Sequence, residues 1–246
     1  YLLNTQRPPV DDVRVRKALA MSVDRDKLVR SVLQNTAVPA YSITPPDTLG
    51  YFPPKLFDYN PDEARRLLAE AGYPNGDGWP GVEILYNTQE AHRKIAVAIQ
   101  PMWKSELGID VTIANQEWKV YLDAVTQIDF QVARRGWIGD YVDANNFLDM
   151  FITGGGNNNT HYGDPVYDDL ILYKAPKATT REERYALFTQ AETMLMEEMP
   201  IIPLYTYTSK HLIHPSVEGM YANLMDSLNL KYVKLVPGRT LPEALR

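Results

Sequence analysis

The chain has 246 residues, a formal net charge of −6 and no cysteine, and 45% of its residues are hydrophobic while 23% are charged. This composition is typical of a globular protein with one large domain or two small ones, and it excludes intrinsic disorder as the main state. Apolar runs stay well short of the roughly 20 residues that span a bilayer. The excess of 31 acidic over 25 basic residues argues against a nucleic-acid surface. The lack of cysteine excludes disulfides and thiolate chemistry.

The first sixty residues predict a short opening strand followed by helices. Apolar residues at helical spacing predict a helix over 12–21, and a second helix is expected over 24–34. The prolines of residues 38–46 permit only an extended or turning path, so this segment is predicted to be a loop. Asn60, followed by proline and acids, is a strong helix start, and Gly72 ends that helix.

The middle of the chain alternates strands with helices. The expected elements are a strand over 82–86, a helix over 89–107 capped by Thr88, a strand over 109–114, a helix over 117–126 and a strand over 130–134. Pro101 is expected to kink or split its helix. This alternation predicts an α/β fold with a mixed, largely parallel sheet covered by helices.

The last hundred residues predict mainly helices and one edge strand. Helices are expected over 144–152, 165–174 and 180–198, an apolar edge strand carrying Pro203 over 201–207, and a weak strand over 229–236.

The motifs of known enzymes are absent from this chain or stand in the wrong context. Gly76, Gly78 and Gly81 have the spacing of a dinucleotide-binding loop, but they follow a helix and lead into a strand, which is the wrong order. His211 and His214 lack further metal ligands, so no metal and no cofactor is expected. Adjacent carboxylates are plentiful, and a carbohydrate hydrolase that uses two converging acids is the alternative from another class. We otherwise expect a binding protein and not an enzyme.

One segment combines several groups suited to ligand binding. Residues 133–141 read ARRGWIGDY and bring two cations, an indole and a carboxylate to the end of a predicted strand. Ligands commonly bind at strand ends in open α/β sheets. The segment is therefore the leading candidate for a binding site.

At this point the chain resembles a known family, the extracytoplasmic solute-binding proteins of peptide importers, and in particular its periplasmic oligopeptide binders. The stretches that carry the resemblance run in family order along most of the chain and read VDDVRVRKALAMSVDRDKLV, VPAYSITPP, EARRLLAEAGYP, ILYNTQEAHRKIAVAIQPMWKSELGI, NQEWKVYLDAV, RRGWIGDY, NNTHY and IIPLYTY.

The resemblance implies a protein of two lobes that close over an extended peptide and deliver it to an ABC permease in the membrane. Residues 1–226 would be the C-terminal ligand-binding lobe, and residues 227–246 a tail that crosses back toward an N-terminal lobe of the same protein. A chain that lacks Met at its start also suggests a piece of something longer. The implied location is the periplasm.

The resemblance also assigns roles to residues of this chain. Asp140 would pair with the α-ammonium group of the ligand, and Arg134 and His92 would meet its carboxylate. A carboxylate that recognises the ligand's ammonium group, while backbone groups pair with the peptide, leaves the ligand's side chains free to vary. The other expected site residues are Trp118, Gly136, Trp137, Ile138 and Tyr207.

One position departs from the family. The family has a lysine near the end of the second helix that can also meet ligand carboxylates, and Ser31, Val32 and Leu33 stand there in this chain. The preferred ligand length therefore stays open, and murein peptides, dipeptides, nickel complexes and oligosaccharides remain alternative solutes. A sensory rather than an importing role also remains open.

Overall fold

A computed structural model describes residues 1–239 of the chain. Eight helices are found in this range, namely α1 Val13–Met21, α2 Arg25–Lys27, α3 Pro61–Glu70, α4 Glu90–Leu107, α5 Trp118–Thr126, α6 Asn145–Leu148, α7 Pro165–Asp169 and α8 Arg181–Glu198. The strands are β1 Leu2–Leu3, β2 Ala37–Pro39, β3 Val82–Asn87, β4 Val111–Gln116, β5 Val132–Ala133, β6 Tyr205–Tyr207, β7 Val217–Glu218 and β8 Lys234–Leu235.

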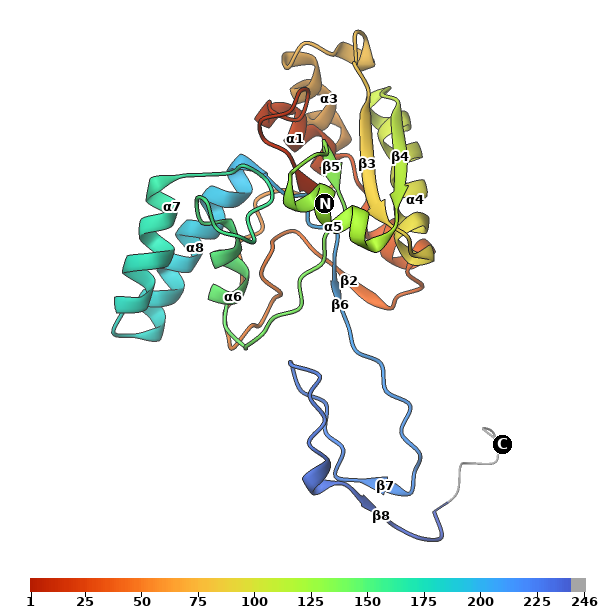
Figure 1. Cartoon of the computed structure of the whole chain (residues 1–246), viewed down its shortest axis with the longest axis vertical. Helices are drawn as coiled ribbons and strands as arrows, with labels where there is room; N and C mark the ends of the chain where they lie inside the picture. The colour runs from red at the N-terminus through yellow and green to blue at the C-terminus, as the bar shows by residue number, and fades with distance from the viewer. Residues whose placement is uncertain (240–246) are drawn as a thin grey trace.

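The central sheet has four strands in the order β1-β5-β3-β4. Strand β3 runs parallel to both β4 and β5, and β1 is antiparallel to β5 at the edge. In Figure 1 these strands form one body with α1, α3, α4 and α5, while α6, α7 and α8 form a second group beside it. The α/β class and the largely parallel sheet are as predicted.

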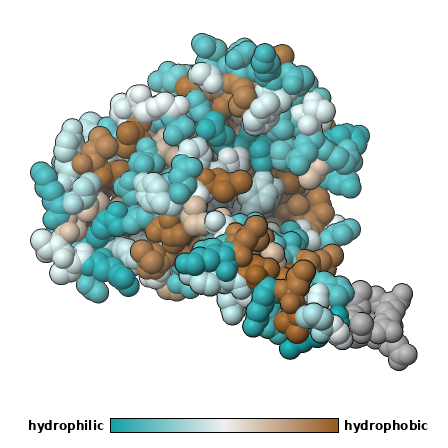
Figure 2. Space-filling view, turned by 60° about the horizontal axis from the view of Figure 1, so that its bottom comes forward, coloured by the Kyte–Doolittle hydropathy of each residue, from teal (hydrophilic) through white to brown (hydrophobic). Residues whose placement is uncertain are grey.

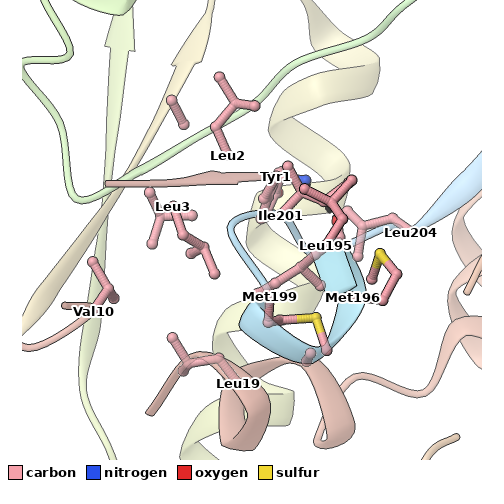
Figure 3. Packing of buried hydrophobic residues seen from close by; sticks show 14 of the residues in the cluster. Tyr1, Leu2, Leu3, Val10, Leu19, Leu195, Met196, Met199, Ile201 and Leu204 are labelled. Atoms are coloured by element: carbon pink, nitrogen blue, oxygen red, sulfur yellow. Dashed lines mark hydrogen bonds between the residues drawn. The ribbon is translucent and has the colours of Figure 1, made fainter. Parts of the chain in front are cut away.

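A single hydrophobic core joins the sheet body to the helical group. Leu2, Leu3, Leu195, Met199 and residues that follow α8 all belong to this core. Figure 3 shows Leu2 and Leu3 on opposite sides of β1, with Leu3 on the side of Leu195 and Met199. The backbone supports this contact, because the amide of Leu3 donates to Pro200 and the amide of Ile202 donates to the carbonyl of Tyr1. Strand β1 therefore holds the C-terminal end of α8 against the sheet.

Helix starts follow the predicted chemistry with one exception. The side chain of Asn60 caps α3 as expected. The helix predicted from residue 180 is also found, and the side chain of Thr180 caps it. The predicted cap Thr88 is wrong, because α4 begins after Gln89 and no side chain caps it. Thr88 instead donates its hydroxyl to Asn115 and to the carbonyl of Gln116, both on the neighbouring strand β4.

Other elements differ from prediction in extent. Helix α4 continues through the exposed Pro101 and is not split. The predicted strand over 130–134 is reduced to two residues, and that over 201–207 to the three residues of β6. The predicted loop over 38–46 begins in strand β2, which pairs with β6 in a separate two-stranded sheet. Sequence alone gave no sign of this pairing, because the partners lie about 170 residues apart.

The C-terminal residues 208–239 form an arm that extends away from the body (Figure 1). Its two short strands pair Val217 with Leu235 and Glu218 with Lys234. The predicted boundary between residues 226 and 227 therefore falls inside this arm, and residues 240–246 of the predicted tail lie outside the described part of the chain.

Candidate ligand-binding site

A cavity of about 590 Å³ lies at the carboxyl end of β5. Most of its wall comes from four segments, which are residues 38–48, residues 134–151, residues 201–209 and residues 224–226 of the arm, and Tyr1, Leu2 and Ile95 complete the lining. The lining includes the expected site residues Arg134, Gly136, Trp137, Ile138 and Tyr207. Apolar side chains and two adjacent cations thus face one cavity that is partly open to solvent.

Arg134, Gly136 and Tyr207 form one cluster in this wall. The amide of Arg134 donates to Leu85 on β3, which fixes its position at the strand end, and its guanidinium donates to the hydroxyl of Tyr207. A side chain at Gly136 would come within 2.9 Å of the Arg134 guanidinium and 3.3 Å of the Tyr207 hydroxyl. Only glycine fits here without displacing the pair.

The cavity wall carries positive charge. Arg135 follows Arg134 and donates to Asn159 at 2.7 Å. Within residues 1–239 neither guanidinium has a salt bridge to a carboxylate, and Asp226 is the only acid among the described lining residues. These two cations favour a ligand with an anionic group near the carboxyl end of β5. A hydrolase with two converging acids has no such pair in this lining.

His92 lies in the first turn of α4, close to the cluster but outside the cavity lining. Its imidazole Nδ1 is 2.9 Å from Asn87 Oδ1, and because an amide oxygen only accepts, Nδ1 carries the proton. Burial, together with the charge of Arg134, lowers the pKa of His92 to about 4. The imidazole is therefore neutral at pH 7, and it would need a second proton to act as a cation.

The loop after β5 places Trp137 and Asp140. The indole Nε1 of Trp137 donates to Asn146 Oδ1 at 2.8 Å, and the backbone amide of Asp140 donates to the same oxygen at 3.2 Å. The Asp140 side chain is exposed. It stands between Gly139 and Tyr141, which both line the cavity, and so it lies at the rim.

Two of the expected residues point largely to solvent. Trp118 is 50% exposed at the start of α5, outside the cavity lining, and stacks on Tyr121 with ring centroids 5.9 Å apart. Ile138 lines the cavity but is 82% exposed. Neither side chain contributes to the core of this lobe.

Sequence reasoning missed several parts of the site. Residues 40–48 enter the wall because β2 pairs with β6, and Asn146 enters through its contacts with Trp137 and Asp140. The only sign in the sequence that residues 40–48 belong to the site is the stretch VPAYSITPP, which resembles the family but implies no role by itself.

Within residues 1–239 no helix is long and apolar enough to cross a membrane. In the same range, no three histidine or acidic side chains gather as a metal ion would require.

Comparison with known proteins identifies the family. Residues 1–159 match the model of the bacterial extracellular solute-binding proteins, family 5, middle region. The chain belongs to family 5. Among curated family 5 proteins, the periplasmic oligopeptide-binding protein OppA of Escherichia coli K12 is 40% identical over 225 residues, which are 89% of this chain and 41% of OppA. The periplasmic murein peptide-binding protein MppA of the same organism is 40% identical over 230 residues, or 91% of this chain and 42% of MppA.

Solved family 5 structures share the fold. The unliganded open form of MppA matches with a TM-score of 0.86 and 37% identity over 95% of this chain and 46% of that one. Haemophilus influenzae OppA, in complex with the peptide RPPGFSPFR, matches with a TM-score of 0.82 and 34% identity over 95% of this chain and 47% of that one. The chain thus has the fold of periplasmic binding proteins, and it spans less than half the length of the curated relatives it matches.

Proposed function

We propose that the protein containing this chain is the substrate-binding component of an ABC peptide importer in the periplasm and has no enzymatic activity. It holds an extended peptide between this lobe and an N-terminal lobe and delivers the peptide to the membrane permease. The observation that carries the proposal is the cavity at the end of β5. Its wall has two cations without a carboxylate partner among residues 1–239, and Asp140 lies at its rim. The similarity to OppA over nearly the whole chain supports it.

The two ends of a peptide have matching groups at this site. Asp140 has an exposed carboxylate that would receive the α-ammonium group, and Arg134 would receive the carboxylate, with His92 nearby. Trp137 and Tyr207 line the space between and would contact the peptide's side chains, with Gly136, Ile138 and the exposed Trp118 around them. Charge-assisted contacts at the termini are independent of the peptide's sequence.

The exposed apolar surface of the arm is evidence in favour of a second lobe. Its apolar side chains are exposed to an unusual degree, with Leu212 fully exposed, Tyr221 75% exposed and Leu235 74% exposed. Figure 2 shows hydrophobic atoms gathered along this arm. Exposed apolar surface of this kind marks a site of interaction, and an N-terminal lobe of the same protein is the partner that the family resemblance implies.

The test is calorimetric peptide binding by the full-length protein. We expect a tripeptide with free termini to bind, and Asp140→Ala to weaken that binding by about 2–5 kcal/mol, because the ligand ammonium would be left without its partner. Asp62→Asn, which changes an exposed acid on α3, is the matched control and should leave the affinity unchanged. No detectable binding of peptides by the unmodified protein would contradict the proposal, and unchanged affinity in D140A would remove Asp140 from the site.

A murein peptide is the second candidate ligand, favoured by the similarity to MppA over 91% of the chain. Mass spectrometry of the molecules that copurify with the full-length protein would separate the two candidates. A linear α-peptide supports the main proposal, whereas a peptide with a γ-linked glutamate supports the second.

A further inference from the structure

Asn146 forms hydrogen bonds to the loop that carries Asp140. The residue lies in the first turn of α6, and only 3% of it is exposed. Its single side-chain oxygen accepts two hydrogen bonds, one from the indole of Trp137 and one from the backbone amide of Asp140. Both donors belong to residues that the proposed function places in the binding site.

The C-terminal end of this loop is fixed at Asp143. Asp143 forms a two-pronged ion pair with Arg184 of α8, and one of its oxygens also accepts from the amide of Asn145. Between Trp137 and Asp143 the chain passes close to α6. A Cβ atom at Gly139 would stand 3.3 Å from the ring of Phe147 and 3.4 Å from the Asn146 oxygen. Asn146 therefore fixes the middle of the loop.

The carboxylate of Asp140 has no hydrogen-bond partner within residues 1–239. Its location is therefore set by its backbone, and Asn146 is the only side chain in the described part of the chain that forms a hydrogen bond to that backbone. A flexible loop would have to be ordered when a ligand binds, and such ordering reduces affinity. A loop that is already fixed avoids this loss.

We infer that Asn146 is a positioning residue that holds the Asp140 carboxylate ready for the α-ammonium group of a peptide. The inference rests on the proposed function and adds a residue to it. Asn146 acts on the ammonium contact through Asp140, and it also holds Trp137, which would contact any bound peptide. Its removal should therefore weaken a peptide with a free amine more than a peptide whose amino group is acetylated, because only the free amine can contact Asp140.

The experiment compares a tripeptide with its N-acetylated form by calorimetry in the full-length protein. Asn146→Ala removes the acceptor and leaves two donors unpaired, and we expect about tenfold weaker binding of the free-amine peptide. The acetylated peptide should lose less affinity than the free-amine peptide, because it can lose only the support that Asn146 gives to Trp137. Asn146→Asp keeps an acceptor oxygen and should bind the free-amine peptide at least as well as the parent.

Asn145 provides the matched control. It is the neighbouring residue on α6, and its amide faces Tyr141 and Asp149 instead of the two donors. Asn145→Ala should preserve the preference for the free amine. If N146A proves unfolded, Asn146→Ser is measured instead, because its shorter side chain cannot reach both donors while it keeps a polar group in place.

Two results would overturn the inference. One is an equal loss of affinity for the free and the acetylated peptide in N146A or N146S, which would indicate general damage to the lobe. The other is an unchanged preference for the free amine. Failure of the proposed function is recognised separately, because the unmodified protein would then bind neither peptide.

Discussion

His92 is buried as a neutral imidazole against Asn87, and its position near Arg134 makes protonation unfavourable. Since its pKa in the folded protein is about 4 and the ordinary value is 6.5, the unfolded chain takes up the proton first as the pH falls. The contribution of His92 to the free energy of unfolding is therefore complete above about pH 6.5 and is lost between pH 6.5 and pH 4, with a size on the order of 2 kcal/mol.

This prediction is checked by denaturant unfolding of the parent and of His92→Gln between pH 4 and pH 8. The parent should lose stability relative to the variant as the pH falls through this range. An NMR titration of the His92 imidazole is the direct measurement, and a midpoint near pH 6.5 would contradict the burial argument.

Single residues of the site could be predicted from sequence only in part. Arg134 and Tyr207 lie 73 residues apart, yet the structure joins them by a hydrogen bond, and Gly136 packs against both. Nothing in the sequence distinguishes Asn146 from Asn145, because a hydrogen bond to a loop nine residues away depends on how α6 packs. The binding roles themselves stay predictions.

Helix α8 is tied to the wall of the cavity by a buried acid. Glu192 is fully buried, and its two oxygens accept from the amide of Thr44 and from the hydroxyl of Tyr51. These residues flank the wall segment 45–48. Burial raises the pKa of Glu192 to about 7, although the two hydrogen bonds partly oppose the shift.

The pH dependence of this contact has the opposite sign to that of His92. Because the folded pKa of Glu192 exceeds the ordinary 4.5, its contribution to stability is complete below about pH 4.5 and is lost as the pH rises to about 7. Glu192→Gln keeps an acceptor for Thr44 without the charge, so it should stabilise the protein by on the order of 2 kcal/mol at pH 8 and little at pH 4.5. Thermal unfolding at both pH values tests this, and a variant less stable at pH 8 would contradict it.

Helix ends could be predicted from sequence more accurately than strand pairings. Asn60, Gly72 and Thr180 mark helix ends that the structure confirms, because capping depends on residues within one turn. The prediction that Thr88 caps α4 was wrong, because its hydroxyl donates to acceptors on β4 instead. Local sequence does not indicate such a contact with a distant strand. The shortening of β5 and the pairing of β2 with β6 are likewise decided by distant partners.

The arm of residues 208–239 is largely exposed to solvent. Between residues 208 and 239 many large apolar side chains are exposed, and the described strands there are only two residues long. Few contacts oppose local opening in such a segment. We propose that the second lobe covers it in the longer protein.

Limited digestion with chymotrypsin tests this proposal. We expect rapid cleavage within residues 208–239 when the 246-residue chain is made alone, and protection of the same bonds in the full-length protein. Tyr167 is buried in the core and serves as the internal control, since it should resist cleavage in both. Equal cleavage of the arm in the two proteins would contradict the proposed cover.

The cavity takes its walls from segments that are far apart in the polypeptide, from Tyr1 at one extreme to Asp226 at the other. Because a ribosome makes a protein from its N-terminal end, a nascent chain that ends at residue 200 still lacks Tyr207 and the lining residues 224–226. The wall of the cavity therefore cannot be complete until synthesis has passed residue 226.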